Sequence, residues 1–271
     1  MSGIVVVGYE GSERSSDVLA LAETLAATED ARLIVAVAHA GSGGEAESAA
    51  SAALSALSRP NEATVALSAS TGLAEVAEQH GATVLVLGSS RRGLLGRLLA
   101  GSTASRLMAS AGCPVAVAPA GYAEAAAPRL RRIGVAIDGS SDSICALRLA
   151  ERIAARVKGR LGVVAVAPSG DEPEAPELTA LLEELVASAP ISARADSDIR
   201  FGDAAVELSD AGEHLDLLVC GSRGRGHAPA ALGSVSSALL QSAPCPVLVV
   251  PPRAARGESP SPLSGRAHQT A

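Results

Sequence analysis

Aromatic residues are nearly absent from this sequence of 271 residues, which holds two tyrosines, one phenylalanine and no tryptophan. Lysine is almost absent too, since Lys158 is the only one. A core without aromatic rings must be built from aliphatic side chains, and the chain is rich in alanine, valine and leucine. Such side chains are typical of parallel strands that are buried on both faces of a sheet.

An excess of positive charge is also missing, because the formal net charge is −7 at pH 7. A general nucleic-acid binder needs a basic face that neutralises phosphates, so we expect no nucleic-acid partner. Charges and prolines interrupt every apolar run before it reaches the length of a membrane span. The N-terminal segment enters a strand-like run at Ile4 without a charged region or cleavage site. We therefore expect a soluble, cytoplasmic protein with no membrane contact.

The four cysteines form no CxxC pair and mostly lie in apolar runs; they are Cys113, Cys145, Cys220 and Cys245. Buried free thiols fit a reducing compartment better than a disulfide framework, and we interpret these residues as packing groups. The five histidines are scattered, and none has a metal-ligand partner at helical spacing. The sequence therefore predicts no metal site.

Two halves of the chain repeat the same order of elements. The first half predicts strands at 4–8, 31–38, 63–69, 83–87 and 115–117, and helices at 17–27, 72–80 and 102–111. Residues 41–60 are rich in Gly, Ser and Ala and predict a loop that ends as a weak helix. The second half predicts strands at 133–137, 161–167, within 191–201, 217–220 and 247–250, and helices at 143–157, 176–189, 203–212 and 234–243.

Landmarks recur in the same order and at nearly constant offsets in both halves. They pair Gly11 with Gly139, Gly88 with Gly221, Gly101-Ser102 with Gly233-Ser234, and Cys113-Pro114 with Cys245-Pro246. One such pair could arise by chance, but the whole series indicates an internal duplication with small loop insertions and deletions.

Strands that alternate with helices predict parallel βαβ units with right-handed crossovers. We predict an α/β protein of two tandem Rossmann-like or flavodoxin-like domains, each a five-stranded, mainly parallel sheet with helices on both faces. The expected limits are residues 1–120 and 131–252, joined by a linker at 121–130 and followed by a disordered tail at 253–271. Such sheets bind ligands beyond the carboxyl ends of their strands.

The loop after the fourth strand of each half is the most informative segment. It contains spaced glycines at 88–93 and 221–226, and a Gly-Ser pair opens the following helix at 101–103 and 233–235. Glycines let a backbone approach an anion closely, and a helix start offers free N–H groups and a favourable dipole. The two elements together predict a cradle for polyphosphate. The alternative is ordinary turn glycines with an N-cap serine.

Known catalytic patterns do not fit these loops. Leu94 and His227 stand where a Walker P-loop has its lysine. A dinucleotide fingerprint would follow the first strand of its unit, not the fourth. Ser222 and His227 could form a nucleophile and base, but nothing in the sequence orients the histidine. We therefore predict no enzyme and no dedicated catalytic site.

Three features together resemble the universal stress protein family, specifically its tandem two-domain actinobacterial members. They are the strand–acid–Gly-Ser start, the Gly-Ser-x-x-x-Gly loop with Gly-Ser before the last helix, and the closing Cys-Pro-Val-x-Val-x-Pro. The resemblance covers about 1–120 and 130–252. It implies ATP as the ligand, with Mg²⁺ as an accompanying ion, and a role in stress response or signalling.

The family's ATP-binding pattern implies candidate residues in both halves. In the first half they are Gly8, Glu10, Ala38, Gly88, Arg91, Gly93, Gly101, Ser102 and Thr103. In the second half they are Asp138, Ala167, Gly221, Arg223, Gly224, Gly226, Gly233, Ser234 and Val235. Within this set, Glu10 or Asp138 would contact the nucleoside, and the main chain at Ala38 or Ala167 would meet adenine.

Each half departs from that pattern in a different way. Arg91 stands where the family has its second glycine, and Glu10 where it has aspartate. The second half keeps Asp138 and both glycines, but its loop is one residue shorter. These departures are compatible with ATP binding by one half, by both or by neither.

The closing strands admit two interpretations. The residues alone favour simple edge strands, in which proline suppresses further pairing. The resemblance implies that Val115–Val117 and Val247–Val250 pair antiparallel and make the chain a pseudo-dimer, and a homodimer of chains is a further expectation. A nucleotide-independent interaction scaffold is the alternative function. A nucleotide-using enzyme is disfavoured by the scarcity of lysine and of clustered carboxylates.

Overall fold

A computed structural model describes most of the chain. The described residues are 3–9, 11, 15–38, 43–57, 64–68, 72–89, 112–124, 129–169, 176, 179–180, 182–184, 194–224 and 232–251. The helix expected at 102–111, most of the helix expected at 176–189 and the tail at 253–271 lie outside these residues.

The first half is a parallel sheet with the strand order β3-β2-β1-β4-β5. Its strands are β1 (Ile4–Tyr9), β2 (Arg32–Ala38), β3 (Thr64–Ser68), β4 (Val84–Gly88) and β5 (Val115–Ala118). The helices described in this half are α1 (Ser15–Glu29), α2 (Gly43–Ala56) and α3 (Leu73–Gln79). The strand order reverses at β1 and β4, which is where open sheets of this type bind ligands.

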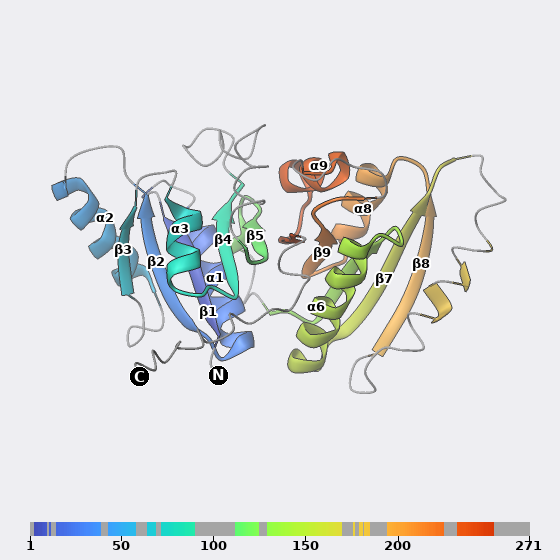
Figure 1. Ribbon diagram of the computed structural model, residues 1–271, viewed down its shortest axis with the longest axis horizontal. Coiled ribbons are helices and arrows are strands. Elements are labelled where there is room, and N and C mark those ends of the chain that lie inside the picture. Colours follow the sequence, from blue (N-terminus) through green and yellow to red (C-terminus); the bar gives the residue numbers. More distant parts are fainter. Residues whose placement is uncertain are drawn as a thin grey trace, which may run out of the picture.

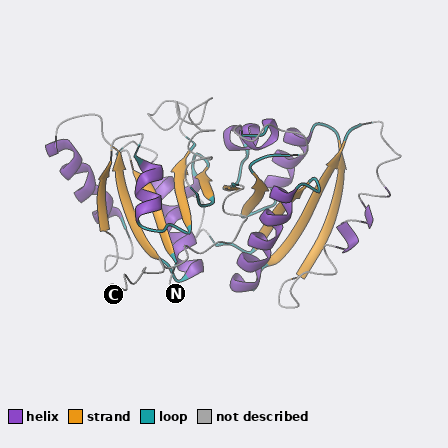
Figure 2. Ribbon diagram, viewed as in Figure 1, coloured by secondary structure: helices purple, strands orange, loops and turns teal. Residues whose placement is uncertain are grey.

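The second half repeats this plan with the order β10-β9-β6-β7-β8. Its strands are β6 (Arg132–Ile137), β7 (Arg160–Ala167), β8 (Arg194–Phe201), β9 (Leu217–Gly221) and β10 (Val247–Val250). The helices are α6 (Ser141–Val157), α8 (Ala204–Gly212) and α9 (Ser234–Ser242). Figures 1 and 2 show helices on both faces of the sheet, and the predicted α/β class with two Rossmann-like units is confirmed.

Strands β5 and β10 pair antiparallel and join the two halves into one ten-stranded sheet. Val247 lies opposite Val117, and Val249 lies opposite Val115. We call this strand pair the seam. Because the seam is central, the edge strands of the sheet are β3 and β8.

Two apolar layers cover the two faces of this sheet, and each layer runs through both halves. One contains buried residues of α1 and α6, including Leu21 and Ile153. The other contains buried residues of α3, α8 and α9, including Leu73 and Leu239. Alternate strand residues supply the two layers, as Val5 and Val6 do, which is the period of two that strands impose.

Helix α2 differs from the expectation for its segment. It begins at Gly43, whereas the sequence suggested a loop that turns helical only near its end. Alanine has the highest helix propensity of all residues, and the Ala- and Glu-containing run outweighs the two glycines at its start. None of the helices within the described ranges has the length and apolar character that a bilayer span requires.

Two carboxylates accept hydrogen bonds from the main chain of the connection between the halves. Asp17 of α1 is buried, and its Oδ2 and Oδ1 accept hydrogen bonds from the main-chain N–H groups of Gly121 and Ala123 at 3.0 and 2.8 Å. Gly121 directly precedes a short 3₁₀ helix, Tyr122–Glu124, and Ala123 lies within it. Asp216 accepts from the N–H groups of Arg131 and Arg132 at 2.8 Å each.

The variant Leu248→Ala tests how much the packing at the seam stabilises the fold. The Leu248 side chain is fully buried, and its strand position is paired with Ala116 of the other half. We expect Leu248→Ala to lower the free energy of unfolding by about 2–5 kcal/mol because it opens a cavity in the core. Urea unfolding followed by circular dichroism measures this loss.

Leu54→Ala is the matched control, because Leu54 on α2 is 38 % exposed. A surface substitution of this kind changes stability by about 0.5 kcal/mol or less. Equal losses for the two variants would contradict a stabilising role of the seam.

Candidate functional site

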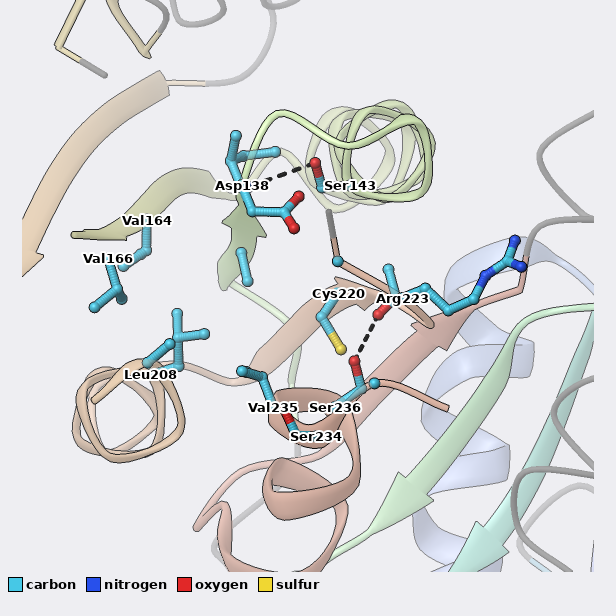
Figure 3. A pocket seen from close by; sticks show the side chains of 16 residues that line it. Asp138, Ser143, Val164, Val166, Leu208, Cys220, Arg223, Ser234, Val235 and Ser236 are labelled. Atoms are coloured by element: carbon cyan, nitrogen blue, oxygen red, sulfur yellow. Dashed lines mark hydrogen bonds between the residues drawn. The ribbon is translucent and has the colours of Figure 1, made fainter. Parts of the chain in front are cut away.

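The second half contains a cavity of about 110 Å³ beside the strands β6, β7 and β9 (Figure 3). It lies at the carboxyl ends of these parallel strands, between α6, α8 and α9. β6 and β9 are the strands at which the order of this half-sheet reverses. The cavity is therefore in the place where doubly wound sheets hold ligands.

One wall of the cavity is apolar. Val164 and Val166 come from β7, Leu208 from α8 and Val235 from α9, and Figure 3 shows the first three on the same side. The two valines are two residues apart, so the strand period places both on the face that α8 covers. An apolar wall with a few polar groups opposite suits a flat organic ring.

Asp138 supplies the carboxylate of the site. It follows β6 directly, and the N–H of Ser140 donates to its Oδ1 at 2.9 Å. Its Oδ2 lies against Gly224, where an added Cβ would come within 2.8 Å of that oxygen. Only glycine therefore fits opposite this carboxylate without displacing it.

The N-terminus of α9 opens on the same cavity. Gly233 is the N-cap and has no side chain to cap the helix, while Ser234 and Val235 line the cavity. The first N–H groups of a helix have no intrahelical partners, and the dipole is positive at this end. The first turn of α9 contains no acidic residue, so nothing in that turn opposes an anion.

Gly221, the last residue of β9, allows the strand to pass directly over the start of α6. A Cβ at this position would lie 2.8 Å from the carbonyl carbon and Cβ of Asp142. Gly88 has the matching role in the first half, where a Cβ would meet Val18 Cγ2 at 2.8 Å. A side chain at Gly221 would displace the backbone at the start of α6, and one at Gly88 would displace the Val18 side chain.

Seven of the candidate residues of the second half line this one cavity. They are Asp138, Gly221, Arg223, Gly224, Gly233, Ser234 and Val235. Of these, Arg223 directs its side chain away from Asp138 (Figure 3), and its Nε pairs with Asp142 Oδ2 at 3.2 Å. The guanidinium of Arg223 therefore points away from the cavity.

Ala167 is the described candidate of this half that does not line the cavity. It is buried at the end of β7, and its carbonyl accepts a hydrogen bond from the N–H of Gly202 at 2.9 Å. The neighbouring Val166 lines the cavity in its place. Strand alternation was the signal that could have identified Val164 and Val166, once the covering helix was known.

The candidates of the first half are described only in part. Gly8 is the next-to-last residue of β1, Ala38 is the last residue of β2, and Gly88 is the last residue of β4. Outside the described residues lie Glu10, Arg91, Gly93, Gly101, Ser102 and Thr103, and Gly226 of the second half.

Cys220 lies in the wall of the cavity, but its thiol is unreactive at neutral pH. Burial raises the pKa of its thiol to about 12, with a smaller opposing effect from the Ser236 hydroxyl. Burial likewise raises the pKa of Cys113 to about 11 and that of Cys245 to about 12. These thiols stay protonated at neutral pH, which agrees with their interpretation as packing groups.

The Ser222 hydroxyl, considered above as a nucleophile, is committed elsewhere. It is buried and donates a hydrogen bond to Asp142 Oδ2 at 3.1 Å. Its proposed base, His227, lies outside the described residues. Across the described ranges, no three His, Cys, Asp or Glu side chains gather closely enough to hold a metal ion.

The fold is that of a doubly wound α/β protein, and its second half has a cavity at the strand switch point. A model described as the universal stress protein family matches residues 45–119 and 129–251. The chain belongs to the universal stress protein family.

Two relatives agree with this assignment, and a solved structure shares the fold. Universal stress protein Rv2319c of Mycobacterium tuberculosis is 32 % identical over 203 residues, which cover 68 % of this chain and 69 % of that protein. Universal stress protein Rv2005c of the same organism is 35 % identical over 181 residues, covering 62 % and 61 %. A universal stress protein from Archaeoglobus fulgidus shares the fold, with a TM-score of 0.69 and 18 % identity over 93 % of this chain and 99 % of that one.

Thiol labelling tests the burial of the cavity wall. At pH 8 a thiol with a pKa of about 12 has roughly 10³-fold less thiolate than one at 9, and the thiolate is the reactive form. We expect iodoacetamide to leave Cys113, Cys220 and Cys245 unmodified in the native chain and to modify them after unfolding. Peptide mass spectrometry reads the sites. Cys145, which is partly exposed, serves as the internal comparison. Rapid native labelling of Cys220 would contradict the packed wall.

Proposed function

We propose that the second half binds an adenine nucleotide, with ATP as the ligand, and that the chain serves stress response or signalling through this binding. One observation carries the proposal. A single cavity combines an apolar wall, the Asp138 carboxylate, the backbone at Gly224 and the uncapped start of α9. These are the groups that a base, a sugar and a phosphate chain require.

Each part of the nucleotide has a counterpart in the cavity. The base would pack against Val164, Val166 and Leu208, since an aromatic ring gains most from apolar contact. A ribose hydroxyl would donate to Asp138, which accepts hydrogen bonds only. The phosphates would lie at Gly224 and at the N-terminus of α9, where N–H groups and the helix dipole favour negative charge.

Mg²⁺ is proposed only as a companion of the nucleotide. The described residues include no carboxylate cluster that would bind it alone, and Mg²⁺ commonly binds through substrate phosphates and water. The cavity offers Asp138 as its one described carboxylate.

We propose that binding, not catalysis, is the function of this site. The Ser222 hydroxyl is buried and does not line the cavity, and burial keeps the Cys220 thiol protonated. A nucleophile must reach its substrate in an activated form. Any hydrolysis of bound ATP would then be slow and intrinsic to the nucleotide.

Binding by the first half, a homodimer of chains and a cytoplasmic location remain predictions. The seam supports the view that the two halves act as one pseudo-dimeric unit, since β5 and β10 share main-chain hydrogen bonds. A second function, a nucleotide-independent interaction scaffold, is the outcome if the cavity binds no nucleotide.

Isothermal titration with ATP, AMP and cyclic AMP tests the proposal directly. We expect at least one equivalent of ATP to bind per chain, and mass spectrometry of the purified protein to detect retained adenine nucleotide. Failure to titrate or retain any adenine nucleotide would contradict the proposal and favour the scaffold. Turnover of a second substrate together with ATP would instead indicate an enzyme.

Gly224→Val assigns the binding to this cavity. Its Cβ would collide with Asp138 Oδ2, so we expect the equivalent bound by the second half to be lost. Gly162→Val is the matched control, because a Cβ at Gly162 meets only Ile133 O at 3.9 Å. Unchanged stoichiometry in Gly224→Val, with both variants folded by circular dichroism, would mean that this cavity was empty in the parent chain.

A further inference from the structure

Asp142 is a buried carboxylate beside the cavity that does not line it. It lies in the first turn of α6, and its side chain is only 6 % exposed. A buried carboxylate is costly unless hydrogen bonds and an opposite charge compensate it. Its partners therefore indicate what it holds in place.

Both partners come from the loop after β9. Asp142 Oδ2 accepts from the Ser222 hydroxyl at 3.1 Å and from Arg223 Nε at 3.2 Å. The two donors are consecutive residues, and both bonds end on the same oxygen. We call this group of three side chains the clasp.

The clasp acts on a loop that is also fixed through its main chain. The N–H of Ser222 donates to the carbonyl of Val250 at 2.9 Å, and the N–H of Gly233 donates to the carbonyl of Ser222 at 2.8 Å. Ser222 is thereby joined to β10, to the start of α9 and, through Asp142, to α6. The Ser140 hydroxyl donates to the carbonyl of Arg223 at 3.4 Å.

Gly224 is the next residue along this loop. A Cβ at this position would displace the Asp138 carboxylate, so a small displacement of the loop changes the space beside that carboxylate. The clasp fixes the two residues immediately before it. Together with the main-chain hydrogen bonds, it therefore restrains the position of Gly224 relative to Asp138 and the start of α9.

We infer that Asp142 is a positioning residue for phosphate binding in the second half, and that Arg223 acts with it, not as a direct phosphate ligand. This inference rests on the proposed function. Asp142 holds the Arg223 guanidinium on the far side of the loop from Asp138 (Figure 3), and the loop presents its backbone to the phosphates. Arg223 in turn compensates a negative charge that would otherwise repel them.

The first half has no counterpart of the clasp in its sequence. Aligning Gly11 with Gly139 places Arg14 at the position of Asp142, and aligning Gly88 with Gly221 places Ser90 at that of Arg223. The carboxylate and the guanidinium are therefore both features of the second half alone. The serine, Ser89 in place of Ser222, is shared.

A double-mutant cycle on ATP affinity tests the inference in the full chain. We expect Asp142→Asn and Arg223→Gln each to weaken ATP binding by about tenfold, and the double variant to bind no worse than either single one. If the two residues act as one unit, either substitution alone removes their whole contribution to ATP affinity. The second substitution then causes no further loss. Adenosine has no phosphate, so its affinity should change much less than that of ATP.

Three results would overturn the inference while leaving the proposed function intact. Asp142→Asn could bind ATP as the parent chain does. It could bind ATP more tightly, which would mean that a released guanidinium reaches the phosphates. The losses could also be additive, as expected if Arg223 contacts phosphate independently of Asp142.

Arg160→Gln is the control for the loss of an ion pair as such. Arg160 pairs with Asp196 at 2.9 Å on the exposed edge of the sheet, and both side chains are mostly in solvent. Exposed pairs contribute little, so ATP affinity should not change. Equal weakening of ATP and adenosine binding in Asp142→Asn would indicate general damage to the fold and would also overturn the inference. A parent chain that binds no adenine nucleotide would instead contradict the proposed function itself.

Discussion

The antiparallel pairing of β5 with β10 is the interaction on which the rest of the structure depends. Each half alone would leave its last strand with unpaired N–H and C=O groups, which attract other chains. The seam satisfies them within one chain and lets both apolar layers run from one half to the other. Helices α1 and α6 also meet across it, where Arg156 donates to the carbonyl of Glu29 at 3.0 Å.

The seam also reaches the candidate site through the main chain. The loop after β4 begins with Ser89, whose N–H donates to Ala118 at the end of β5, and the loop after β9 begins with Ser222, whose N–H donates to Val250 at the end of β10. The first residue of each loop is therefore hydrogen-bonded to a seam strand. In the second half, Asp142 adds a side-chain restraint to the same residue. The geometry at Gly224 is thus determined jointly by the seam, by α6 and by α9.

Much of this architecture was predictable because it follows from short-range patterns. Short apolar runs predicted the strands, and paired glycines and Cys-Pro steps indicated the duplication. Asp138 and Gly224 were candidates because the family's ATP-binding pattern implied them, and the structure places both beside one cavity. Asp142 was not, since an acidic residue in the first turn of a helix is ordinary. Its partners, 80 or more residues away, became visible only in the folded chain.

A crystal structure of the chain with ATP tests the central claim most directly. We predict the base against Val164 and Val166, the phosphates at Gly224 and the start of α9, and the Arg223 guanidinium still paired with Asp142. A nucleotide found elsewhere on the chain, with this cavity free of ligand, would contradict the assignment of the site. A guanidinium that leaves Asp142 to contact the phosphates would contradict the role assigned to the clasp.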